Sequence, residues 1–88
     1  MTDRETRLKR LKIRSWRRGT KEMDLILGKF ADEELAGLSP EDLDAHEVMM
    51  AEHDQDLYKW ISGQAEVPPE IGAAIARVKT HFAKQFSK

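Results

Sequence analysis

Apolar residues recur along the chain at helical spacing and predict five helical segments. In the segment over residues 20–36 they fall at i, i+3, i+4 and i+7, as Met23, Ile26, Leu27 and Phe30. The segment over residues 69–86 has the cleanest stripe, formed by Ile71, Ala74, Ile75, Val78 and Phe82. Such a period is typical of helices with one buried face, and no segment shows the two-residue alternation of a strand. We therefore expect an all-α fold, a small single-domain bundle of about five short helices.

Residues that start and end helices predict the boundaries. Ser39 before Pro40 is typical of an N-cap followed by the first helical position. Gly19 is expected to end the first helix in a left-handed conformation, and Thr20 and Asp54 are expected to cap the helices that follow them. The predicted helices span residues 4–18, 20–36, 40–53, 55–62 and 69–86.

The third predicted helix has a less regular pattern. Leu43, Glu47 and Met50 share one face, with His46 beside it, whereas Met49 is expected to point elsewhere. Methionine at helical spacing is interpreted as flexible core filling and not as a binding feature.

The charge of the chain changes sign at residues 16–24. Up to Glu22 there are nine Lys or Arg and three Asp or Glu, a net charge of +6, and the remainder carries −7, which together give −1. The first predicted helix therefore has a strongly basic surface, on which Ile13 lies among arginines and away from the apolar stripe of Leu8 and Leu11. Trp16 and Ile13 suggest that part of this surface meets a partner.

The composition offers little for catalysis. The 88 residues include no cysteine, which excludes disulfides and thiolate chemistry, and no apolar run is long enough to span a bilayer. Acids and histidines crowd residues 46–54, but His46 and His53 are two helical turns apart, about 10 Å, so no metal site is expected. No glycine-rich phosphate loop is present. We expect no catalytic residues and no cofactor of the chain's own.

Two kinds of partner remain. A basic N-terminal arm containing Trp16 could bind nucleic acid, but the segment 40–53, where a recognition helix would lie, is acidic and has no Lys or Arg. Protein recognition fits better, because Arg18 offers a rigid fork of donors and Gly19 lets another main chain approach closely. In the alternative interpretation Arg18 and Glu22 form only a local ion pair.

Two blocks of the sequence resemble a known family. Arg18-Gly19-Thr20-Lys21-Glu22 matches the Arg-Gly-x-x-Glu motif of the SdhE-type succinate dehydrogenase assembly factors, and the similarity continues to Leu27. The segment 54–63 resembles a second signature of that family, in which we single out Asp54, Asp56, Leu57, Tyr58 and Trp60. His53 stands before it, where many members appear to carry proline.

The resemblance implies a helical assembly factor that binds the flavoprotein subunit of succinate dehydrogenase, and of fumarate reductase where that enzyme is present. Such a factor promotes covalent attachment of FAD to a histidine of the partner, and the FAD belongs to the partner. Whether the factor itself contacts FAD stays open. We also expect no nucleic acid partner, no membrane insertion, a monomer when free and a cytoplasmic location. The residues assigned to partner binding are Trp16, Arg17, Arg18, Gly19, Glu22 and Asp24.

Overall fold

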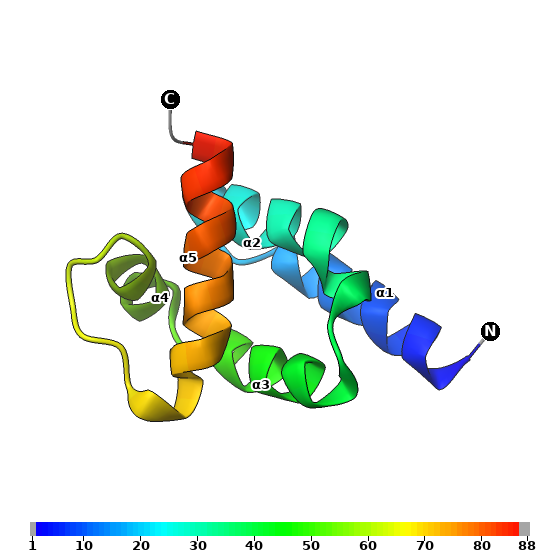
Figure 1. The fold of residues 1–88 in the computed structure, drawn as a ribbon. Coiled ribbons are helices and arrows are strands. Elements are labelled where there is room, and N and C mark those ends of the chain that lie inside the picture. The colour runs from blue at the N-terminus through cyan, green and yellow to red at the C-terminus, as the bar shows by residue number, and fades with distance from the viewer. Residues whose placement is uncertain (1, 87–88) are drawn as a thin grey trace.

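The computed structural model of the chain describes residues 2–86 and contains helices only, which confirms the all-α prediction for this part of the chain. Five α-helices follow one another: α1 (Asp3–Ser15), α2 (Lys21–Glu34), α3 (Pro40–Met50), α4 (Asp54–Ile61) and α5 (Gly72–Phe86). Short 3₁₀ turns at Leu35–Gly37 and Pro69–Ile71 extend the end of α2 and precede α5. In Figure 1, α5 crosses the middle of the bundle, with α4 on one side and the N-terminal end of α1 on the other.

The helix ends follow local chemistry. Thr20 accepts a hydrogen bond from the Met23 amide, and Ser39 accepts one from the Asp42 amide, so both act as N-caps. Gly19 has a φ angle of +116°, which agrees with the left-handed conformation expected there. The expectation that Gly19 ends the first helix is wrong, because α1 already ends at Ser15, with Trp16 as its C-cap. The predicted cap at Asp54 is wrong. His53 occupies the N-cap position without a side-chain cap bond, and the Asp54 carboxylate is held by Arg18.

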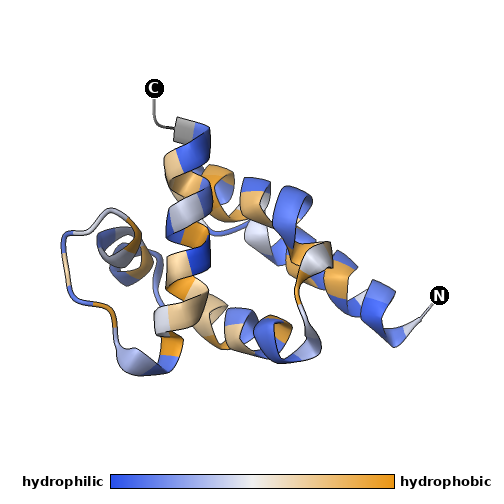
Figure 2. Cartoon of the chain, in the orientation of Figure 1, coloured by the Kyte–Doolittle hydropathy of each residue, from blue (hydrophilic) through white to orange (hydrophobic). Residues whose placement is uncertain are grey.

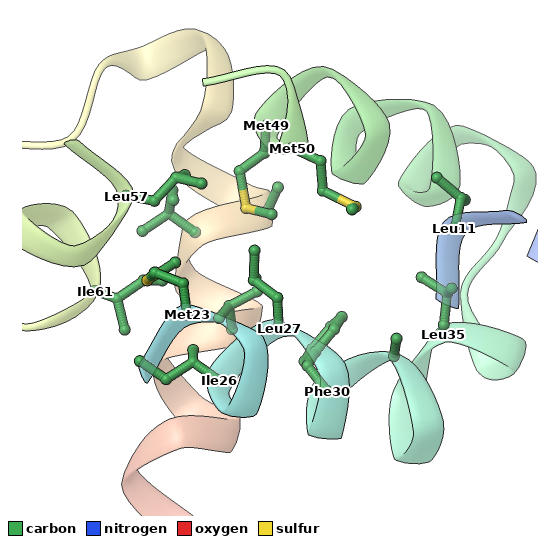
Figure 3. Packing of buried hydrophobic residues seen from close by; sticks show 14 of the residues in the cluster. Leu11, Met23, Ile26, Leu27, Phe30, Leu35, Met49, Met50, Leu57 and Ile61 are labelled. Carbon is green, nitrogen blue, oxygen red and sulfur yellow. The ribbon is translucent and has the colours of Figure 1, made fainter. Parts of the chain in front are cut away.

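The core is a single cluster to which all five helices contribute. In Figure 2 hydrophobic and hydrophilic bands alternate along the helices, as expected for amphipathic helices packed round a common centre. Figure 3 shows Met49 and Met50 both extending from α3 into the space between the helices. Met49 is completely buried, so the expectation that it points elsewhere is wrong. The reason is that α3 packs on α5 and also lies against α1, where Ser15 Oγ is 3.8 Å from Met50 Sδ.

Ionic contacts attach the basic helix α1 to its neighbours. The Arg4 guanidinium donates to the carbonyls of Ala36 and Leu38 at 3.0 and 2.7 Å. The Arg7 guanidinium donates to Asp44 and Glu47 on α3 at 2.7 and 2.9 Å. Part of the positive charge of α1 therefore forms hydrogen bonds and ion pairs with other segments of the bundle.

Trp16 packs on α2 at a glycine. A Cβ atom added to Gly28 would overlap the indole ring of Trp16, whose Nε1 donates to Asp32 at 3.3 Å. Gly28 lies in the middle of a helix, where glycine is unfavourable by about 1 kcal/mol relative to alanine. The close approach of the ring explains why a residue without a side chain lies at this position.

We expect Gly28→Ala to destabilise the protein, because the overlap costs about 1–3 kcal/mol, more than the helix propensity that alanine returns. The matched control is Gly72→Ala, where no heavy atom lies within 4 Å of the added Cβ. That variant should be more stable by about 0.4–1 kcal/mol. Thermal melts of both variants check the contrast. A Gly28→Ala protein as stable as Gly72→Ala would contradict the close contact.

A buried histidine stacks in the centre of the bundle. His46 is 1% exposed, and its ring lies on Phe30 with centroids 5.1 Å apart, while His81 meets the edge of the same phenyl ring. Its Nε2 has no hydrogen-bond partner among the described residues. Burial, together with the positive charge of Arg77, lowers the pKa of His46 from 6.5 to about 4, against a smaller opposing effect of Glu47.

Because of this depressed pKa, we expect the free energy of unfolding to decrease as the pH falls. The unfolded chain binds a proton at His46 below about pH 6.5, whereas the folded protein binds it only near pH 4. The contribution is therefore present above pH 6.5 and is lost between pH 6.5 and 4. From pH 7 to 5 we expect it to reduce the free energy of unfolding by about 2 kcal/mol. Urea melts at the two pH values measure this, with His46→Phe as the test variant.

His46→Phe should lose that part of the pH dependence, and His53→Gln should keep it because His53 is exposed. Equal pH dependence in wild type and His46→Phe would contradict a buried neutral imidazole.

Candidate functional site

The site is built around Arg18, whose side chain turns into the protein. Its guanidinium donates to the carbonyls of Met50 and Glu52 at 2.7 and 2.9 Å and to the Asp54 carboxylate at 2.7 Å. The Arg18 and Asp54 side chains are only 12% and 18% exposed. We call this group of bonds the Arg18 clamp. It joins the connection between α1 and α2 to the connection between α3 and α4.

The clamp also satisfies two helix ends. The Met50 carbonyl belongs to the last residue of α3, where free carbonyls give the helix a partial negative charge that a cation stabilises. Asp54 is the first residue of α4, where a carboxylate favours the positive end of the helix dipole. One arginine therefore pairs with the Asp54 carboxylate and also stabilises the partial negative charge at the end of α3.

Two further residues shape the corner around Arg18. Asp24 accepts a hydrogen bond from the Arg18 amide and so holds the backbone of the corner against the first turn of α2. Gly19 reverses the chain between Arg18 and the cap Thr20, and a Cβ at this position would lie 3.8 Å from Asp54 Oδ2. Its positive φ, more than crowding, disfavours other residues here.

Glu22 is the acid of the corner that stays on the surface. It lies in the first turn of α2, is exposed, and makes no hydrogen bond or ion pair within residues 2–86. The local ion pair between Arg18 and Glu22 is therefore not formed; Arg18 pairs with Asp54 instead. Arg17 is likewise exposed and has no ionic partner among the described residues.

An open hollow of about 470 Å³ lies beside the corner, between the start of α2 and α4. Glu22, Tyr58 and Lys59 are among its lining residues, and Met23 and Gln55 also contribute. Tyr58 is 40% exposed, so the hollow has an aromatic wall together with an acid and a base. The clamp therefore joins the two blocks of sequence that resemble the family, the one that begins at Arg18 and the segment 54–63, and the hollow lies between them.

The other residues of the second block have different positions. Leu57 is fully buried, and Trp60 is partly buried against the core. Asp56 lies in the first turn of α4 and is half-buried. Trp16 remains 38% exposed although its ring covers Gly28, so only part of it is open to a partner.

The acids and histidines of residues 46–54 do not converge. His46 is buried in the core, Glu47 is paired with Arg7, and Asp54 belongs to the Arg18 clamp. Over the described range no three His, Cys, Asp or Glu side chains are placed to hold a metal ion together. None of the helices described is long and apolar enough to cross a bilayer.

Sequence reasoning missed two features of the site. Asp54 was read as a helix cap, whereas it is the partner of Arg18, 36 positions earlier in the chain. The hollow was also not foreseen, because it depends on how α4 lies against α2. In the sequence, the signal for the first feature is an acid directly after one predicted helix break and an arginine directly before the glycine of another.

The fold and the site together define a small helical domain with a polar corner that is held by internal hydrogen bonds. The family model described as flavinator of succinate dehydrogenase matches residues 9–82, and the chain belongs to this family. It is similar to succinate dehydrogenase assembly factor 2, mitochondrial, of Meyerozyma guilliermondii, with 39% identity over 75% of this chain and 49% of the relative. The factor of the same name in Dictyostelium discoideum is 33% identical over 86% of this chain and 54% of the relative.

The chain therefore spans about half the length of these curated relatives. No solved structure matches the chain significantly.

We expect Arg18→Ala to lower the free energy of unfolding by about 1.5–3 kcal/mol, because it removes charged hydrogen bonds and leaves Asp54 unpaired. For a domain of this size the melting temperature should fall by roughly 10 °C. Arg17→Ala is the matched control, since it removes the same charge from an exposed neighbour. Thermal melts of both variants are the measurement, and similar melting temperatures would contradict the clamp.

Proposed function

We propose that this protein is an assembly factor that binds the flavoprotein subunit of succinate dehydrogenase and promotes covalent attachment of FAD to it. Its membership of the flavinator family supports the class of function. The observation that carries the proposal for this chain is the corner itself. It is held rigid from inside by Arg18, and it presents Glu22 beside an open hollow without a partner in the described part of the chain.

In this proposal the residues of the corner have two different roles. Arg18, Asp24 and Gly19 set the shape of the backbone, and Glu22 and Arg17 face the partner. The assignment of Arg18 as a direct partner contact stays a prediction, but three of the five N–H donors of its guanidinium are already used by internal acceptors. A preformed corner reduces the entropy that is lost on binding, which favours affinity.

The hollow adds a contact surface beside the acid. Tyr58 offers an aromatic ring, and such residues are enriched where protein interfaces bind most tightly. Lys59 and Glu22 line the same hollow with opposite charges, so a partner segment that carries both a base and an acid is complementary to it. The second family block thereby gains a role at the surface in addition to its role in the core.

The proposed mechanism is orientation of the partner and not chemistry by this chain. In the family resemblance, the factor holds the domains of the flavoprotein so that a partner histidine reacts with a methyl group of the isoalloxazine ring. Both reacting groups belong to the flavoprotein. The factor's own residues then contribute by binding and by fixing the geometry of the partner, which shortens the search for the reactive arrangement.

Fumarate reductase flavoprotein is a second target within the same proposal, because the resemblance covers both enzymes. We also propose a cytoplasmic setting, whereas the curated relatives are named as mitochondrial. Localisation of a tagged protein in its own cells tests that point.

Glu22→Ala is the variant that tests the proposal. We expect the melting temperature to fall only slightly, because an exposed acid in the first turn contributes roughly 0.3–1 kcal/mol through the helix dipole. If Glu22 pairs with a donor that becomes buried in the complex, its removal costs about 2–5 kcal/mol of binding, a loss of roughly thirtyfold or more. The measurements are a thermal melt, a titration against purified apo-flavoprotein, and covalent flavin detected by in-gel fluorescence.

Glu41→Ala is the matched control, because Glu41 is also an exposed acid in the first turn of a helix, α3. Both variants should lose the same small amount of stability, and only Glu22→Ala should lose binding and flavin attachment. If Glu22→Ala binds and supports flavin attachment like Glu41→Ala, Glu22 is only a helix-start residue, and the corner is not the interface.

A further inference from the structure

The nine basic residues before Met23 fall into two groups in the structure. Arg4, Arg7, Arg14 and Arg18 each donate to a carbonyl or pair with a carboxylate inside the bundle. The other five have neither an ion pair nor a side-chain hydrogen bond within residues 2–86; they are Lys9, Arg10, Lys12, Arg17 and Lys21. The bundle therefore neutralises less than half of these cations.

Two of the unpaired cations, Lys9 and Arg10, lie beside an exposed isoleucine on α1, and a third, Arg17, lies just beyond the end of this helix. Lys9 and Arg17 lie four positions before and after Ile13, and Arg10 lies three positions before it, so Lys9 and Arg10 are its neighbours on the surface of α1. Lys9, Arg10 and Arg17 are exposed, and Ile13 is 48% exposed. We call these four residues the basic ridge. The opposite side of α1 is the buried one, where Leu11 and Ser15 lie.

The ridge leads along the chain to the candidate site. Arg17 directly precedes the clamp residue Arg18, and both Arg17 and Glu22 are exposed. Figure 1 shows α1 at the edge of the bundle. Unpaired cations repel one another along a helix, and no acid within residues 2–86 forms an ion pair with the three cations of the ridge.

We propose that the basic ridge docks on an acidic surface of the flavoprotein and guides its approach to the corner. This inference rests on the proposed function and adds a second contact surface to it. Charge complementarity identifies the occupant: the ridge offers three free cations, and a cluster of carboxylates would satisfy them. Ile13 provides an apolar point among the charges, as in the centre of many protein interfaces. Exposed charges of this kind mainly raise the rate of association, and that rate falls as salt is added.

Two other classes of partner fit the ridge less well. A helix that lies on a membrane needs a broad apolar face, and the apolar face of α1 is buried in the core, which leaves only Ile13 outside. Duplex nucleic acid presents a long phosphate surface, and acids on the neighbouring helices, such as Asp32 and Asp44, would lie close to it. A local acidic patch on a protein avoids both difficulties.

The experiment measures association and dissociation rates with the purified apo-flavoprotein at several salt concentrations. The test variants are Lys9→Glu, Arg10→Glu and the two combined. At low salt the double variant should associate about tenfold more slowly than wild type, and the difference should shrink as salt increases. Dissociation rates should change less than association rates. Thermal melts confirm that the variants are folded.

The matched control is Lys84→Glu, an equal change of charge at an exposed position of α5. It should associate within about twofold of wild type, since its charge lies outside the ridge. Ile13→Ser is the second test variant. It should leave the association rate unchanged and raise the dissociation rate by about tenfold, because it removes an apolar contact without changing charge.

The outcomes separate this inference from the proposed function. If wild type binds the flavoprotein but the ridge variants associate like wild type, or slow down only as much as Lys84→Glu, the ridge is not a docking surface and the corner proposal stands. If wild type does not bind the flavoprotein at all, both proposals fail. If the double variant instead loses a sub-micromolar affinity for duplex DNA or for anionic vesicles that wild type possesses, the ridge belongs to that partner and this inference is overturned.

Discussion

The Arg18 clamp is the interaction on which the rest of the arrangement depends. One guanidinium reaches the last carbonyl of α3, a carbonyl of the following loop and the first carboxylate of α4. Within residues 2–86, no other ion pair joins the connection between α3 and α4 to the N-terminal half, because the pairs of Arg7 and Arg14 reach the middle of α3 instead. Together with the burial of Leu57 and Ile61 in the core, the Arg18 clamp holds α4 in its position beside the start of α2, where the hollow lies.

The residues of this short motif therefore face in two different directions. In Arg18-Gly19-Thr20-Lys21-Glu22 the first residue faces the interior and the last faces solvent. Gly19 and Thr20 between them reverse the chain and start α2. The exposed residues that such a corner carries are held in place by contacts within the chain itself. This division explains how a chain of 88 residues offers a defined surface without a large core.

The helices could be predicted from the sequence because their signals are local. Ser39 with Pro40 and the stripe from Ile71 to Val78 need only neighbouring residues for their interpretation. The contacts between distant segments could not be predicted in the same way. Asp54 looks like a helix cap within its own segment and becomes the partner of Arg18 only when α4 is placed. The prediction for Met49 is wrong for a related reason, since a helix that packs on two sides buries residues outside its main apolar stripe.

The contact between Trp16 and Gly28 ties two positions of the chain to each other in evolution. An indole ring at position 16 leaves no room for a Cβ atom at position 28 unless the ring moves, whereas a small residue at 16 would leave a gap that a side chain at 28 could fill. The residues that fit at these two positions therefore depend on each other. Because Trp16 immediately precedes the basic residues that lead to the corner, a paired exchange would also alter the surface beside the corner.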